Sequence, residues 1–160
     1  MAFDWKQVDW ADRNARIGVY FTVHEALWLP GWRVYHVPSG AEKQEIVKTA
    51  AAMDQIRGLF NAAVHVHCWM RPRKVTAPSS PRDGQDYNAF AGSKSVNSPH
   101  VFGRAADFHI AWMEGAAGCA HARQIILPHL EAWNIRMEDM NGGWIHIDTN
   151  PVVRKRFFKP

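Results

Sequence analysis

Residues 98–112 read SPHVFGRAADFHIAW and combine a turn with a strand-like run. Gly103 favours a turn, and the run from Ala105 to Trp112 is expected to form a β-strand. In that strand Asp107 and His109 share one face and apolar side chains occupy the other. A sheet with one apolar face and one polar face is typical of the floor of an active site.

A second segment with the same alternation lies near the C-terminus. Residues 144–148, WIHID, place His146 and Asp148 on one face and two isoleucines on the other. The turn at Gly103 returns the chain towards His100, which precedes the first strand. The sequence therefore predicts two polar strand faces and one turn histidine near each other.

Two imidazoles and one carboxylate form a ligand set typical of catalytic zinc. His100, Asp107 and His146 would fill three positions of a tetrahedral ion and leave the fourth open for water. Zinc lowers the pKa of that water to about 7 and polarises a carbonyl group. The chain has nine histidines, so spacing alone does not decide the ligand set.

The spacing of these residues resembles the signature of the zinc D-Ala-D-Ala carboxypeptidase and L-alanyl-D-glutamate endopeptidase family. The matching positions are Ser98, His100, Gly103, Ala105, Asp107, Trp144 and His146. Weaker similarities lie at residues 21–25, 69–72, 88–92 and 146–151. This family shares its fold with lysostaphin-type peptidases and the hedgehog N-terminal domain.

The resemblance implies an activity and a role for each matching residue. It implies that His100, Asp107 and His146 hold one Zn²⁺ ion and that the substrate is a peptidoglycan stem peptide. It also implies that Arg71 binds a substrate carboxylate, for which a bidentate guanidinium is well suited, with Arg73 as the alternative.

The chain departs from the family pattern at the catalytic acid. Several members carry this acid three residues before the last ligand histidine, where this chain has Gly143. Glu138 and Asp139 are the nearest carboxylates. A three-residue turn after Met140 would place Glu138 opposite His146, whereas a two-residue turn would put Asp139 on that face. Both remain candidates for the general base, and Glu138 is preferred.

Patterns elsewhere predict an α+β fold in a single domain, residues 1–160. The expected elements are a short helix after Thr22, a helix from Ser39 to Phe60, strands at 64–69, 105–112, 135–138 and 144–148, a helix at 121–133 kinked at Pro128, and a long loop at 71–99. We expect helices packed on a small antiparallel sheet whose polar face carries the zinc.

Other histidines and tryptophans allow more than one interpretation. His65 and His67 share a strand face and could chelate a metal, or could simply be exposed or line the cleft. His109 could support the site or lie at the solvent edge. Asp148 could orient a ligand imidazole or cap the turn that follows. Four tryptophans in apolar runs are expected in the core: Trp28, Trp69, Trp112 and Trp133.

Composition and charge bear on partners and location. Eight Trp and eight Phe argue against disorder, and a formal charge of +4 suits an anionic partner such as a bacterial wall. The sequence lacks a stripe of alternating aromatic and basic residues of the kind that would indicate nucleic-acid binding. The N-terminal residues show no signal peptide and no apolar run could span a bilayer, so we expect a protein made in the cytoplasm. We also expect it to be a monomer.

Two biological roles fit these expectations. The first is a phage or prophage lysin, or a virion-associated protein, that cuts the cell wall once the membrane opens. The second is a non-catalytic module of the same fold, in which zinc is structural and the cleft only binds wall peptide or a protein.

Overall fold

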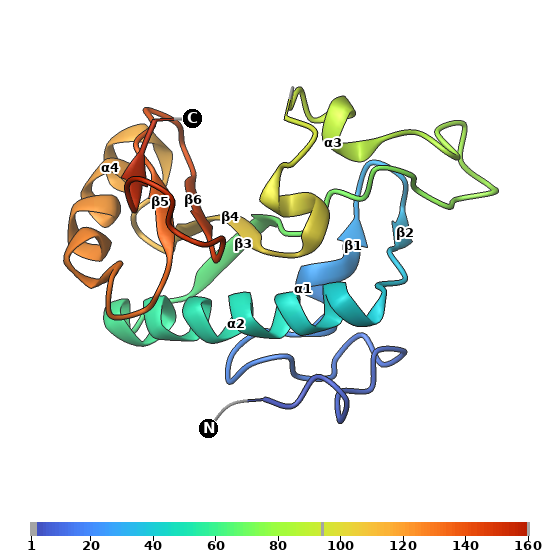
Figure 1. The fold of residues 1–160 in the computed structure, drawn as a ribbon, viewed down its shortest axis with the longest axis horizontal. Helices are drawn as coiled ribbons and strands as arrows, with labels where there is room; N and C mark the ends of the chain where they lie inside the picture. Colours follow the sequence, from blue (N-terminus) through green and yellow to red (C-terminus); the bar gives the residue numbers. More distant parts are fainter. Residues whose placement is uncertain (1–2, 94, 160) are drawn as a thin grey trace.

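Two sheets and four α-helices make up the part of the chain that the structure, a computed structural model, describes: residues 3–93 and 95–159 (Figure 1). The fold is α+β, as predicted. The expected domain and the expected loop at 71–99 also include residues 1, 2, 94 and 160, which lie outside the described residues.

The main sheet has five strands in the order β3-β4-β6-β5-β7. These are β3 (Val64–Cys68), β4 (Ala105–Ile110), β6 (Ile145–Asp148), β5 (Arg136–Glu138) and β7 (Phe157–Phe158). Neighbouring strands are antiparallel except β5 and β7, which are parallel. The prediction of a small antiparallel sheet is therefore wrong at this edge. The two residues of β7 are too few to show a strand pattern in the sequence.

The register of β4 and β6 places the polar residues side by side. Asp107 lies opposite His146, and Ala105 lies opposite Asp148. Because side chains alternate along a strand, the intervening residues point to the other face. There Phe108 and the isoleucines of β6 are completely buried.

Helix α2 (Gly40–Phe60) runs beneath the sheet and covers its apolar face (Figure 1). The predicted capping box is confirmed, because the Glu42 carboxylate accepts a hydrogen bond from Ser39 N (2.6 Å) and Ser39 Oγ accepts one from Glu42 N (3.3 Å). Gly103 packs against this helix with φ at +74°, and a Cβ there would lie 2.7 Å from Ile46 Cγ1. Glycine is thus required where the chain turns from His100 into β4.

Two predicted elements differ in extent. Helix α4 (Gly115–Ile126) begins earlier than expected and gives way to a 3-10 turn, η2 (Leu127–His129), at the predicted Pro128 interruption. Strand β4 ends at Ile110, and Trp112 has a φ of +71° and is 90% exposed. The expectation that Trp112 lies in the core is therefore wrong, because the positive φ turns its side chain out of the strand alternation.

The N-terminal part and the loop contain short elements. Helix α1 (Val23–Leu27) follows Thr22 as predicted, and a two-stranded sheet pairs β1 (Trp28–Leu29) with β2 (Val34–Tyr35). The loop at 71–99 is not wholly irregular, because it contains α3 (Tyr87–Phe90) and the start of the 3-10 helix η1 (Pro99–Phe102).

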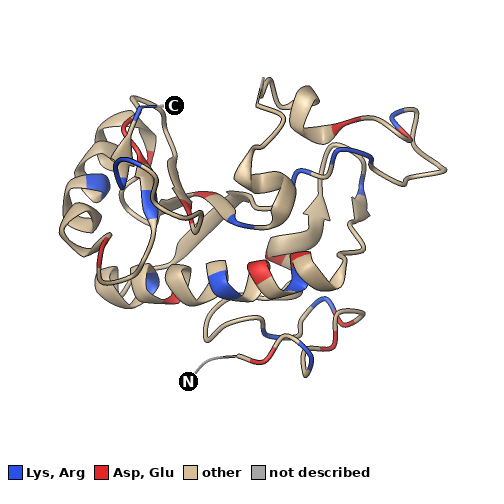
Figure 2. Cartoon of the chain, in the orientation of Figure 1, with Lys and Arg blue, Asp and Glu red and all other residues tan. Residues whose placement is uncertain are grey.

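Charged residues are distributed over the helices, loops and C-terminal segment, with both signs interspersed (Figure 2). Four basic residues lie close together near the C-terminus, Arg154, Lys155, Arg156 and Lys159, and all of these except Arg156 are exposed. Arg156 instead donates to the carbonyl groups of Ile135 (3.2 Å) and Leu130 (3.4 Å). Part of this cluster therefore anchors the tail beside β5.

Candidate metal centre

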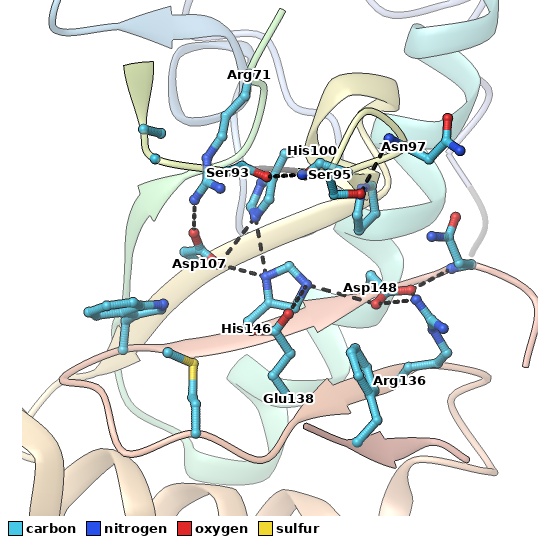
Figure 3. Close-up of a pocket in the computed structure, with 18 residues that line it drawn as sticks. Arg71, Ser93, Ser95, Asn97, His100, Asp107, Arg136, Glu138, His146 and Asp148 are labelled. Atoms are coloured by element: carbon cyan, nitrogen blue, oxygen red, sulfur yellow. Dashed lines mark hydrogen bonds and ion pairs between the residues drawn. The ribbon is translucent and has the colours of Figure 1, made fainter. Parts of the chain in front are cut away.

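Three polar atoms converge on the polar face of the sheet (Figure 3). The Nε2 atom of His100 on η1 lies 3.2 Å from Nδ1 of His146 on β6. Oδ1 of Asp107 on β4 lies 2.8 Å from His146 Nδ1 and 3.2 Å from His100 Nε2. Nitrogen or oxygen ligands of a tetrahedral zinc ion are separated by about 3.3 Å. The structure thus brings the three predicted ligand atoms to nearly the separation that one zinc ion needs.

Hydrogen bonds orient His100 so that one ring nitrogen is available. Its Nδ1 lies 2.8 Å from the carbonyl oxygen of Trp69, to which it donates. This bond fixes Nδ1 as a protonated nitrogen and turns Nε2 towards Asp107 and His146, where it can bind a metal once its own proton is lost. His100 is 1% exposed, so water does not compete for this arrangement.

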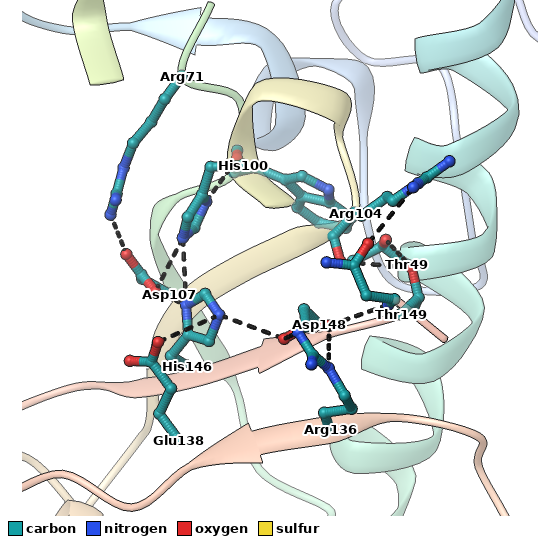
Figure 4. A network of polar contacts seen from close by, with 12 residues as sticks. Thr49, Arg71, His100, Arg104, Asp107, Arg136, Glu138, His146, Asp148 and Thr149 are labelled. Carbon is teal, nitrogen blue, oxygen red and sulfur yellow. Dashed lines mark hydrogen bonds and ion pairs between the residues drawn. The ribbon is translucent and has the colours of Figure 1, made fainter. Parts of the chain in front are cut away.

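The outer nitrogen of His146 is the most informative atom of the site. His146 Nε2 is buried and lacks a hydrogen-bond partner among the described residues. It faces Asp148 Oδ2 at 3.8 Å and Glu138 Oε1 at 3.9 Å (Figure 4). With Nδ1 on a metal, Nε2 would carry the proton and be stabilised by these two carboxylates. The donors present therefore fit a zinc ion.

The charges of the metal-free site are unusual. Burial disfavours a charged His100, but the adjacent Asp107 carboxylate raises the pKa of His100 to about 9. Burial likewise opposes ionisation of Asp107, yet His100 and His146 hold its pKa well below the ordinary value. The site without metal is consequently a buried carboxylate stabilised by imidazolium.

Zinc binding should therefore release protons. At pH 7 the metal-free His100 is protonated, since its pKa is about 9, and zinc binds only the neutral imidazole. Asp107 is already ionised and releases none. We expect at least about one proton released per zinc at pH 7, with apparent affinity rising with pH and levelling off above about 9. Titration calorimetry in buffers of different ionisation enthalpy measures this number, and a value of zero would contradict the assignment.

Cys68 provides an alternative third ligand. One donor atom each from Cys68, His100 and Asp107 lies within 4.8 Å of the others, so this group could hold a metal ion. Cys68 Sγ already accepts a hydrogen bond from Arg71 Nε at 3.2 Å. The separations of 2.8–3.2 Å with His146 match a zinc ion more closely than this looser group.

Arg71 lies beside the predicted ligands and lines the cleft above them. Its Nη2 donates to Asp107 Oδ2, which holds the carboxylate with Oδ1 towards the imidazoles. Its own backbone N–H donates to the carbonyl of His100 at 3.1 Å. The alternative residue, Arg73, is exposed and does not line this cleft.

The two candidate bases lie in different surroundings. Met137 pairs with Ile147, and continuing that register places Glu138 opposite His146, as the three-residue turn predicts. Glu138 lines the cleft with a side chain that is 20% exposed. Asp139 is exposed and does not line the cleft.

An ion pair between partly exposed Arg136 and a buried carboxylate next to the ligands was not anticipated. Arg136 donates from Nε and Nη2 to the two oxygens of Asp148, at 2.8 and 2.9 Å, and Asp148 is fully buried. Burial would raise the pKa of Asp148, but His146 and Arg136 lower it. Asp148 also accepts from Asn150 N at 2.9 Å, so it both faces the ligand imidazole and caps the turn.

Removal of one partner of this pair should destabilise the protein. The Arg136→Met substitution leaves the Asp148 carboxylate buried without its cation, and we expect the free energy of unfolding to fall by about 3 kcal/mol. The double substitution Arg136→Met with Asp148→Asn carries no unpaired charge and should lose less. Denaturant unfolding of the metal-free proteins measures both, and a double variant as unstable as the single one would refute the explanation.

The ligand atoms lie on the floor of an open cleft of about 640 Å³. Its walls include residues for which no role was predicted, and these mix polar and apolar side chains: Ser93, Ser95, Asn97, Met140, Asn150 and Phe158. Trp144, adjacent to β6, also lines it and is 43% exposed. Such a cleft can receive an extended polar chain.

Comparisons with family models, with curated proteins and with solved structures found no match. Among the described residues, no helix has both the length and the apolar character needed to cross a membrane.

Proposed function

We propose that this chain is a zinc-dependent peptidase that hydrolyses amide bonds in the stem peptides of bacterial peptidoglycan. The observation that carries the proposal is the triangle of His100 Nε2, Asp107 Oδ1 and His146 Nδ1 on the floor of an open cleft. The substrate class comes from the resemblance of the sequence around these residues to the signature of the D-Ala-D-Ala carboxypeptidase and L-alanyl-D-glutamate endopeptidase family.

Each residue would contribute a separate part of the reaction. Zinc, when bound by His100, Asp107 and His146, supplies an acidified water and polarises the carbonyl that is attacked. Glu138, on the cleft wall, takes a proton from the attacking water and passes it to the leaving amine. Its place in the lining of the cleft supports this role, because it is a carboxylate that faces the cleft without being one of the three ligands.

Arg71 would bind a carboxylate of the stem peptide. Its Nε and Nη2 are used by Cys68 and Asp107, which hold the guanidinium at the edge of the cleft. Its Nη1 makes no hydrogen bond within the described part of the chain and can donate to substrate. In this role Arg71 both orients a ligand carboxylate and positions the peptide.

The biological setting we propose is a phage or prophage lysin, or a virion-associated protein, acting as a monomer on the cell wall. The net charge of +4 supports binding to an anionic wall.

The competing function is a non-catalytic wall-binding or protein-binding module stabilised by zinc. Its specific support is Cys68, which is close to His100 and Asp107. Burial disfavours the thiolate, but His100 and Arg71 lower the pKa of Cys68. A thiolate in the fourth position would close the site to water and substrate.

Digestion of purified peptidoglycan separates these functions. The zinc-loaded protein is incubated with peptidoglycan, and the released muropeptides are identified by mass spectrometry. We expect new termini within the stem peptide, which also identify the bond cut, and no such products with Glu138→Gln. Binding to the wall without cleavage, with one zinc per chain present, would favour the non-catalytic module.

A further inference from the structure

Three histidines gather on the polar face of the sheet outside the cleft. His65 and His67 lie on the edge strand β3, and His109 lies on β4. None of them lines the cleft that holds the candidate zinc ligands. Nothing in the proposed peptidase mechanism uses them.

The strand register explains why these side chains meet. His65 lies directly opposite His109, and His67 follows two residues later on the same face. A register shift between Val66 and Cys68 accompanies the approach of His67 to its cross-strand neighbour. His67 Nε2 lies 2.7 Å from His109 Nδ1, and the rings of His65 and His109 stack with centroids 4.9 Å apart.

The contact between His67 and His109 has the geometry of a chelating pair. The two nitrogens are slightly closer than the roughly 3.3 Å that separates ligands of a tetrahedral ion. His67 is exposed and His109 partly exposed, so small ring rotations can open this distance.

We propose that His67 and His109 chelate a second divalent transition-metal ion at the surface of the sheet, with His65 near enough to provide a third imidazole. Imidazole ligands suit Zn²⁺, Ni²⁺ and Cu²⁺, and Cu²⁺ binds such sites most tightly. The remaining positions are open to water because the site is exposed. This site is independent of the buried candidate centre and does not require that the protein be a peptidase.

Metal stoichiometry of the full chain tests the site. Equilibrium dialysis against Zn²⁺, followed by elemental analysis, should give two ions per chain for the wild type. The double substitution His67→Asn with His109→Asn should retain one ion. His121→Asn, which changes another exposed histidine, should retain two. Unfolding of the metal-free variants checks that they remain folded, as expected for substitutions at exposed positions.

A Cu²⁺ probe and a second variant keep the two sites distinguishable. In His146→Ala, the surface site should still bind one Cu²⁺, with nitrogen hyperfine structure in its paramagnetic resonance spectrum that is lost when His67 and His109 are also replaced. The same number of zinc ions bound by the wild type and by His67→Asn with His109→Asn would overturn the proposal. Absence of zinc from the buried centre, with the surface site still occupied, would contradict the proposed peptidase and leave the surface site supported.

Discussion

The His146→Ala protein is expected to bind zinc at the buried site more than about 100-fold more weakly than the wild type and to lose hydrolytic activity. Loss of even a residue that only orients a ligand costs about 10–100-fold in metal affinity, and His146 supplies a ligand atom itself. Its Nδ1 lies 2.8 Å from Asp107 Oδ1 and 3.2 Å from His100 Nε2, so its removal opens the triangle. Zinc competition with a chromogenic chelator, together with muropeptide release, measures both effects.

A matched control separates metal loss from general damage. His121→Ala removes an exposed imidazole that lies outside the cleft, and it should keep the affinity of the buried site and the activity. Unchanged zinc affinity of the buried site in His146→Ala would remove the basis of the assignment. Denaturant unfolding shows whether the variant is folded under the assay conditions.

The Glu138→Gln protein is expected to keep its zinc and to lose about 10²–10⁴-fold in kcat, the usual contribution of a positioned general base. Gln is nearly isosteric with Glu and cannot accept the proton. Glu138 lines the cleft but is not one of the three ligands, so the substitution should remove proton transfer and leave the zinc in place. The value of KM should change little.

Asp139→Asn is the matched control for Glu138→Gln. Asp139 is adjacent in sequence, but it is exposed and does not line the cleft, so we expect activity within about threefold of the wild type. Should neither substitution lower turnover at least about tenfold, the general base lies elsewhere. A large loss in Asp139→Asn alone would reverse the assignment.

The part of the site that was predictable follows local rules. Strand alternation indicated that Asp107 and His146 face the same side, and the turn at Gly103 indicated the return of His100. The structure places these three atoms within 3.2 Å of one another. The sequence left two hairpin registers open, and the pairing of Met137 with Ile147 is the register of the three-residue turn, which places Glu138 opposite His146.

Some unanticipated features depend on contacts between distant segments. Strand β7 is defined by backbone pairing with β5, and its two residues show no pattern that would indicate it. Cys68 comes close to the ligands next to a register shift in β3, and no residue in that strand indicates such a shift in the sequence. Trp112 leaves the core because of its positive φ, which apolar patterning does not reveal.

The Arg136–Asp148 pair is a different case. The three-residue turn that places Glu138 opposite His146 also places Arg136 opposite Asp148. Opposite charges in directly facing positions of two strands are expected to pair. This ion pair could therefore have been predicted for the three-residue turn, and its opposite charges favour that turn over the two-residue one.

X-ray absorption spectroscopy at the zinc edge tests the central claim most directly, because it identifies the atoms bonded to the ion. With the surface site removed by His67→Asn and His109→Asn, the protein loaded with one zinc should show only nitrogen and oxygen neighbours, at about 2.0–2.2 Å. A sulfur neighbour at about 2.3 Å would identify Cys68 as a ligand and contradict a three-residue site with an open position.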